Sequence, residues 1–91
     1  MTTEREAKIL EGAIAKYGSF MQINIAIEEM SELTKALIKD RRYCTDETMQ
    51  AVKEEMADVG IMLNQLALIY GDCSEEEIVK LERLERLVQD D

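Results

Sequence analysis

Histidine is missing from this chain of 91 residues, and so are proline and tryptophan. Without histidine the chain has no imidazole base, no histidine metal ligand, and no di-iron bundle site of the kind that needs Glu-x-x-His motifs. The two cysteines, Cys44 and Cys73, lie far apart and lack the spacing of a metal site. We therefore expect reduced thiols, no structural disulfide and a cytoplasmic location.

Residues that interrupt helices are scarce, because the chain has no proline and only four glycines. Capping patterns that begin at Thr3, Ser19, Thr45 or Asp46, and Ser74 predict four helices, over about residues 4–16, 20–39, 46–70 and 75–88. The connections between them are short, which favours antiparallel neighbours. The sequence therefore predicts one all-α domain over residues 1–91, a compact four-helix bundle with antiparallel central helices.

Basic residues are also few, with 11 lysines and arginines against 20 acidic residues and a formal net charge of −9. Nucleic acids and anionic membrane surfaces attract basic proteins, so neither is an expected partner. The longest apolar stretch, around residues 60–70, is too short and too polar to span a bilayer. A phosphorylated small molecule stays possible as a ligand, because a bound divalent metal reverses the local charge.

An internal near-repeat is the most informative feature of the sequence. Residues 28–33 are EEMSEL and residues 54–59 are EEMADV, each in the middle of an expected helix. Residues three apart on a helix lie on one face, one turn apart. Each copy therefore places two acidic side chains on one face, and these four residues are Glu29, Glu32, Glu55 and Asp58.

Apolar neighbours predict that these four acids are partly buried. The flanking positions on the same faces are Ile25, Ala36, Ala51 and Met62, whereas Glu28 and Glu54 have polar company and are expected to face solvent. Four converging carboxylates repel one another unless a cation lies between them, and Lys39 alone cannot offset them. Oxygen ligands suit Mg²⁺, or Mn²⁺ in its place, and Mg²⁺ commonly binds substrate phosphates as well.

The motif Glu29-x-x-Glu32, a gap of 22 residues and then Glu55-x-x-Asp58 resembles the signature of the MazG-like all-α nucleoside triphosphate pyrophosphohydrolases. Dimeric dUTPases belong to the same superfamily, and the resemblance is strongest over residues 20–70. It implies Mg²⁺-dependent hydrolysis of a nucleoside triphosphate to the nucleoside monophosphate and pyrophosphate. It also implies that the four acids hold the metal and that the chain assembles with itself as a homodimer or homotetramer.

The resemblance further implies basic residues near the triphosphate, often from the region after the second acidic motif. The candidates here are Lys80, Arg83 and Arg86, which equally fit an ordinary solvated helix face, and Lys39 is a further candidate because it lies near the Glu29 and Glu32 face. For the base, only stacking candidates can be named, and they are Tyr17, Phe20 and Tyr43.

The expected mechanism is metal-assisted hydrolysis in which one acid, Glu32 or Glu29, also acts as base toward water. No other nucleophile is evident, since Ser31 has no histidine to activate it and Cys44 has no evident base. Two alternatives stay open. One is a non-catalytic helical interaction module that is a degenerate relative of the enzymes, and the other is a phosphohydrolase acting on a non-nucleotide pyrophosphate.

Overall fold

The computed structural model describes residues 3–90, and these residues form four helices and no strands. The first helix, α1 (Glu4–Tyr17), begins at a capping box. The Thr3 hydroxyl accepts a hydrogen bond from the amide of Glu6 at 3.1 Å, and the Glu6 carboxylate accepts one from the amide of Thr3. The chain then turns at Gly18, whose φ of 88° is costly for a residue with a side chain. The all-α class predicted from the sequence is confirmed for the described residues.

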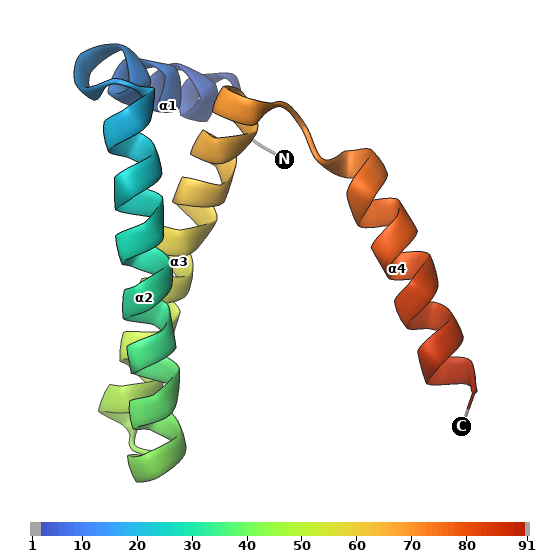
Figure 1. Cartoon of the computed structure of the whole chain (residues 1–91). Coiled ribbons are helices and arrows are strands. Elements are labelled where there is room, and N and C mark those ends of the chain that lie inside the picture. Colours follow the sequence, from blue (N-terminus) through green and yellow to red (C-terminus); the bar gives the residue numbers. More distant parts are fainter. Residues whose placement is uncertain (1–2, 91) are drawn as a thin grey trace.

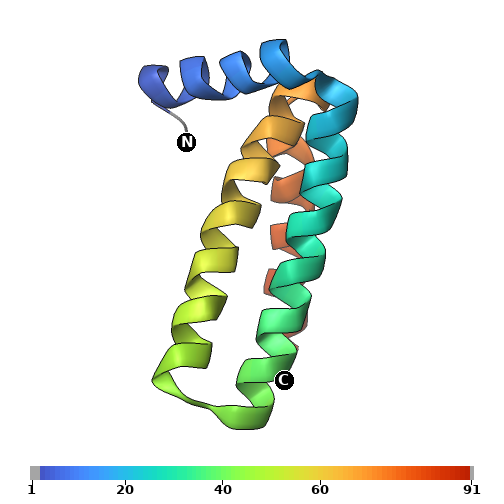
Figure 2. The same ribbon diagram turned by 90° about the vertical axis from the view of Figure 1, so that its left-hand side faces the viewer.

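The two longest helices, α2 (Ser19–Tyr43) and α3 (Asp46–Tyr70), form an antiparallel hairpin (Figure 2). Each has 25 residues and is about 37 Å long. The predicted end of α2 near Lys39 is wrong, because no glycine or proline interrupts residues 40–43 and the helix continues to Tyr43. It ends where Cys44 adopts a left-handed conformation with φ of 49°, and Thr45 then caps α3.

The serines at residues 19 and 74 do not cap their helices as the sequence predicts. Ser19 and Ser74 are the first residues of their helices, and neither of these helices has a side-chain hydrogen bond at its N-cap. The Ser74 hydroxyl instead donates to the carboxylate of Asp72 at 2.8 Å. Glycine before Ser19, and Asp72 before Ser74, therefore determine these two starts more than the serines do.

Helix α1 lies across the open end of the hairpin and contacts both α2 and α3 (Figure 2). Its Leu10 is buried, together with Ala26 of α2 and Met62 of α3. The remaining buried side chains are polar, namely Gln22, Thr48 and Gln65. The core within a single chain is therefore small, as expected for so few packed helices.

The last helix, α4 (Ser74–Gln89), packs on no other helix within the described part of the chain and projects away from the hairpin (Figure 1). The radius of gyration is 16.0 Å, against about 12 Å for a compact chain of this length. The predicted compact packing of all four helices is therefore not found in the single chain. None of the described helices combines the length and apolar character that a membrane crossing requires.

Candidate metal centre

Two side-chain hydrogen bonds join the helices of the α2–α3 hairpin. Near its open end the side-chain Nε2 of Gln65 donates to the side-chain Oε1 of Gln22 at 2.9 Å, and near the connection the Thr48 hydroxyl donates to the carboxylate of Asp40 at 2.8 Å. Both hydrogen bonds are at least half-buried, where an unpaired polar group is costly. They therefore disfavour a slip of one helix along the other.

This register brings acidic residues of the two repeats together. Glu29 lies seven residues after Gln22, and Asp58 lies seven residues before Gln65, so both are about two turns further into the hairpin. A cluster of three carboxylates results, formed by Glu29, Glu55 and Asp58, with one oxygen of each lying within 4.8 Å of the others. We call these three residues the carboxylate triad.

Burial within the triad is graded. Glu29 and Glu55 are half-buried between the helices, whereas Asp58 is exposed. Glu28 and Glu54, the sequence neighbours of the two half-buried acids, are exposed, as the helical positions predict. The triad therefore has two carboxylates with restricted access to water and one at the solvent boundary.

Glu32, the fourth predicted ligand, is not part of this cluster. Its side chain is 51% exposed and forms an ion pair with Lys35, at 3.4 Å between Nζ and Oε1. It lies one turn beyond Glu29 and is close enough to act electrostatically on that residue. The structure thus brings together three of the four predicted acids and places the fourth beside them.

The electrostatics of the triad favour a bound cation. Burial raises the pKa of Glu29, and Asp58, Glu55 and Glu32 raise it further by repulsion, with a hydrogen bond between Glu29 and Asp58 acting in the same direction. The Glu55 Oε2 atom is buried and has no hydrogen-bond partner among the described residues. A buried acceptor without a donor is costly, and a metal ion is one way to satisfy it.

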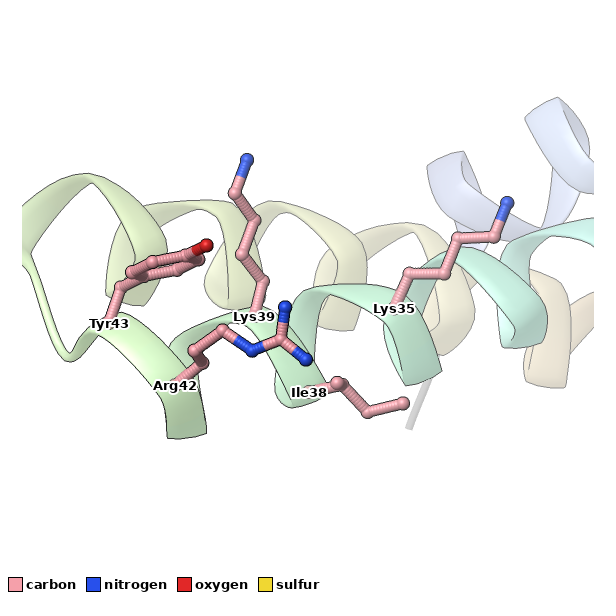
Figure 3. A pocket seen from close by; sticks show the side chains of 5 residues that line it. All are labelled: Lys35, Ile38, Lys39, Arg42 and Tyr43. Carbon is pink, nitrogen blue, oxygen red and sulfur yellow. The ribbon is translucent and has the colours of Figure 1, made fainter.

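A basic patch lies further along α2 on the side that carries Glu32. Lys39 is seven residues, and about 10 Å, beyond Glu32. It lines a surface pocket together with Lys35, Ile38, Arg42 and Tyr43 (Figure 3). In Figure 3 the amino groups of Lys35 and Lys39 extend to the same side of the helix. The Arg42 guanidinium carbon lies 6.0 Å from the Tyr43 ring centroid.

Most of this basic patch was missed by the sequence reasoning, which named only Lys39 and Tyr43. The available signal was the spacing of Lys35, Lys39 and Arg42 at intervals of four and three residues, which places them on one side of a helix. The assumed end of the helix near Lys39 obscured this pattern, because Arg42 was assigned to a loop.

The other basic candidates lie elsewhere. Lys80, Arg83 and Arg86 are exposed on α4, which contacts no other helix in the described chain. Within one chain they therefore do not reach the triad. Of the predicted stacking residues, Tyr43 borders the basic patch, while Tyr17 and Phe20 lie near the turn between α1 and α2 and are exposed.

No protein-family model, no curated protein and no solved structure matches this chain.

Proposed function

We propose that this chain is a MazG-like pyrophosphohydrolase that cleaves a nucleoside triphosphate, with Mg²⁺, to the monophosphate and pyrophosphate. The observation that carries the proposal is the triad itself: three carboxylates from two helices converge within 4.8 Å. Two of them are half-buried, a costly arrangement unless it serves to bind a cation. A converging set of this kind differs from the scattered charges of an acidic surface.

The residues fit a divalent metal in three respects. All ligand atoms are oxygens, which Mg²⁺ and Mn²⁺ prefer. Oxygens on opposite sides of one Mg²⁺ ion are about 4 Å apart, close to the spread found in the triad. The unpartnered Oε2 of Glu55 supplies a buried acceptor. Glu29, Glu55 and Asp58 would hold the ion, and Glu32 would join them by a change of rotamer that releases Lys35.

When bound, such an ion neutralises phosphate charge and acidifies water. The chain's own residues would supply the base and the orientation. Glu29 is the better placed of the two candidates for the base, because it belongs to the triad, whereas its raised pKa applies to the chain without a cation. Glu32 is exposed and paired with Lys35, which makes it the weaker candidate.

The basic patch would bind the anionic part of the substrate that extends from the triad. Lys39 and Arg42 offer charge-assisted hydrogen bonds to phosphate oxygens, and Tyr43 offers a ring for stacking. A triphosphate nucleotide has both groups, an anionic chain and an aromatic base. The distance of about 10 Å from Glu32 to Lys39 suits a ligand of that length.

The proposal includes assembly as a homodimer or homotetramer in the cytoplasm. Two free, exposed cysteines suit a reducing compartment. Because α4 is apart from the rest of its own chain, Lys80 and Arg83 would contact substrate only at the site of a neighbouring copy.

The test is product analysis with a panel of nucleoside triphosphates in the presence of Mg²⁺ or Mn²⁺. We expect pyrophosphate and the monophosphate in equal amounts, and no free phosphate. Release of phosphate instead would place cleavage at the terminal group and contradict the proposal. Turnover of only non-nucleotide pyrophosphates would favour the phosphohydrolase alternative.

A non-catalytic interaction module is the second candidate. The exposed apolar residues of α4, which include Ile78, Leu81 and Leu84, favour it because such residues commonly mediate protein contacts. An interaction module requires no metal, so its melting temperature would not change with Mg²⁺ or Mn²⁺. Metal-induced stabilisation together with turnover would exclude this alternative.

A further inference from the structure

Glu32 lies between the carboxylate triad and the basic patch on α2. Glu29, Glu32, Lys35 and Lys39 follow one another at intervals of three, three and four residues, so each lies about one helical turn beyond the last. Glu32 is therefore one turn from a triad residue in one direction and one turn from the first lysine of the patch in the other. Its carboxylate has two neighbours of opposite charge, the triad and Lys35.

Of these two neighbours, Glu32 contacts Lys35. The Nζ atom of Lys35 lies 3.4 Å from Oε1 of Glu32, and the two side chains are 73% and 51% exposed. Three carboxylates already lie together at the triad, so without a cation they would repel a fourth. An exposed ion pair of this kind stabilises the chain little, because water screens the charges and two long side chains lose conformational freedom. The pair is therefore easily exchanged for stronger partners.

Lys35 also lines the pocket of the basic patch, where its amino group extends to the same side as that of Lys39 (Figure 3). The pocket has a volume of about 310 Å³, at the lower end of the range for small-molecule sites, and its lining contains three cations and no carboxylate. Cations this close repel one another, and a bound anion relieves the repulsion. A triphosphate chain carries several negative charges against the single charge of Glu32, so it competes with Glu32 for the Lys35 amino group.

A divalent cation at the triad would compete for the other half of the pair. Mg²⁺ prefers octahedral coordination by oxygens, which requires more ligands than three carboxylates supply when each gives one atom. A cation that draws Glu32 towards the triad leaves Lys35 without its carboxylate. The same exchange operates in reverse, because a phosphate that binds Lys35 releases Glu32 for the cation. By linkage, each ligand then raises the affinity for the other.

We propose that Glu32 holds Lys35 in the free chain, and that Lys35 transfers to a phosphate group of the substrate when Glu32 turns to the metal. Lys35 thereby couples the binding of the divalent cation to the binding of the triphosphate, and the pocket binds the triphosphate more tightly once the cation is in place. This inference rests on the proposed function, and it gives Lys35 a role that the four acids do not supply.

The first test is Mn²⁺ binding to the full chain without nucleotide, measured by electron paramagnetic resonance. Lys35→Gln should bind Mn²⁺ about two- to fivefold more tightly than the wild type, because Glu32 no longer has to leave an ion pair. Lys53→Gln is the matched control, since Lys53 is an exposed lysine two residues before Glu55 and forms no ion pair among the described residues. An equal gain in both variants would show that Lys35 acts only through its general charge, and would overturn the proposal.

A second comparison removes Glu32 first. In a Glu32→Gln chain the further change Lys35→Gln should leave the Mn²⁺ affinity unaltered, because the pair is already broken. The same gain with and without Glu32 would show that Lys35 does not act through this carboxylate, and would contradict the exchange. Neither comparison depends on turnover.

Substrate affinity should respond with the opposite sign. Lys35→Gln should raise KM for the triphosphate about tenfold with little change in kcat, because it removes a charge-assisted contact to phosphate. Lys35→Arg should stay within about twofold of the wild type, since arginine pairs with both carboxylate and phosphate. An unchanged KM in Lys35→Gln would show that Lys35 does not transfer to the substrate.

The outcomes separate this inference from the proposed function. A wild type that binds no Mn²⁺ and releases no pyrophosphate would contradict both. Mn²⁺ binding without turnover would contradict the proposed function and, with it, the transfer of Lys35 to phosphate. A wild type that binds Mn²⁺ and releases pyrophosphate, with Lys35→Gln unchanged in both measurements, would contradict the exchange alone.

Discussion

Glu28 and Glu29 are neighbours in the chain but differ in surroundings. Their side chains point about 100° apart on α2, so that Glu28 is exposed while Glu29 is half-buried beside Asp58 and Glu55. The same contrast separates Glu54 from Glu55 on α3. Each pair therefore provides a matched comparison of a triad residue with a surface residue of the same type.

Substitution within these pairs tests the role of the triad. Glu29→Gln and Glu55→Gln should each lower kcat about 100-fold or more, because each removes a charged oxygen ligand. Glu28→Gln and Glu54→Gln should stay within about twofold of wild type. The measurement is pyrophosphate release with the best substrate of the panel. Equal loss in Glu28→Gln and Glu29→Gln would show that the faces are wrongly assigned.

The raised pKa of Glu29 predicts a dependence of metal-free stability on pH. The folded chain holds this proton more tightly than the unfolded chain, so its free energy of unfolding should rise as the pH falls from neutral towards the usual glutamate value of 4.5. Below that pH Glu29 is protonated in both the folded and the unfolded chain, so it adds nothing further to the free energy of unfolding. Urea unfolding with a chelator present measures the effect, and Glu29→Gln should have a flatter pH profile. An identical profile for the two proteins would show that Glu29 titrates normally.

At the scale of the element, the two long helices differ in how their N-termini are capped. Helix α3 begins at a capping box in which the hydroxyls of Thr45 and Thr48 each accept the other's backbone amide, and the Thr48 hydroxyl also donates to Asp40 of α2. Helix α2 follows Gly18 with no side-chain cap. The connection between the helices is thus anchored at the α3 end.

Alanine substitution at Thr45 and at Ser19 tests whether each residue caps the helix that begins there. Thr45→Ala should lower the free energy of unfolding by about 1 kcal/mol, because it removes a cap. Ser19→Ala should change it by a few tenths at most, since Ser19 is the first helical residue and makes no capping hydrogen bond. Thermal or urea unfolding measures both. A loss of unfolding free energy as large for Ser19→Ala as for Thr45→Ala would show that Ser19 caps α2, as the sequence predicts.

The C-terminal half of α2 carries the basic patch and permits a kinetic test. Lys39→Gln and Arg42→Gln should each raise KM about tenfold with little change in kcat, because each removes a charge-assisted contact to substrate that is made equally in the ground and transition states. Lys53→Gln is the control, an exposed lysine on α3 outside the patch. Steady-state kinetics decide the matter, and an unchanged KM in both patch variants would mean that the substrate binds elsewhere.

At the scale of the whole molecule, a small core leaves the single chain with little stability to spare. The buried apolar residues are Leu10, Ala26 and Met62, and α4 adds no contact to them. Ligands that bind only the folded state should therefore have a clear effect. Metal binding at the triad, as proposed above, would be one such contribution.

Metal should raise the melting temperature of the intact chain. At a hundredfold excess of metal over its dissociation constant the gain is about 2.7 kcal/mol. Thermal unfolding with and without Mg²⁺ or Mn²⁺, and with a non-hydrolysable nucleotide analogue, measures this gain. The double variant Glu29→Gln, Glu55→Gln should lose the response while keeping its metal-free stability, because it relieves repulsion between acids. No shift under any of these conditions would rule out the metal centre.

Local information in the sequence determined the helices and the sides on which the acids lie. Capping at Thr3, the absence of proline and the three-residue spacing of Glu55 and Asp58 all act within single helices, where hydrogen bonds and a fixed rotation per residue decide the outcome. The exposure of Glu28 and Glu54 followed from the same periodicity. The same local rules failed at Tyr43, where nothing in the sequence marked the end of α2.

Only the tertiary structure decided which side chains from different helices meet. The register in which Gln22 pairs with Gln65 brings Asp58 and Glu55 to Glu29, while Glu32 stays at the surface with Lys35. Likewise, the separation of α4 follows from packing and not from its own amphipathic pattern. Pairing between helices depends on the sum of many contacts along both partners, and no single segment of sequence contains that sum.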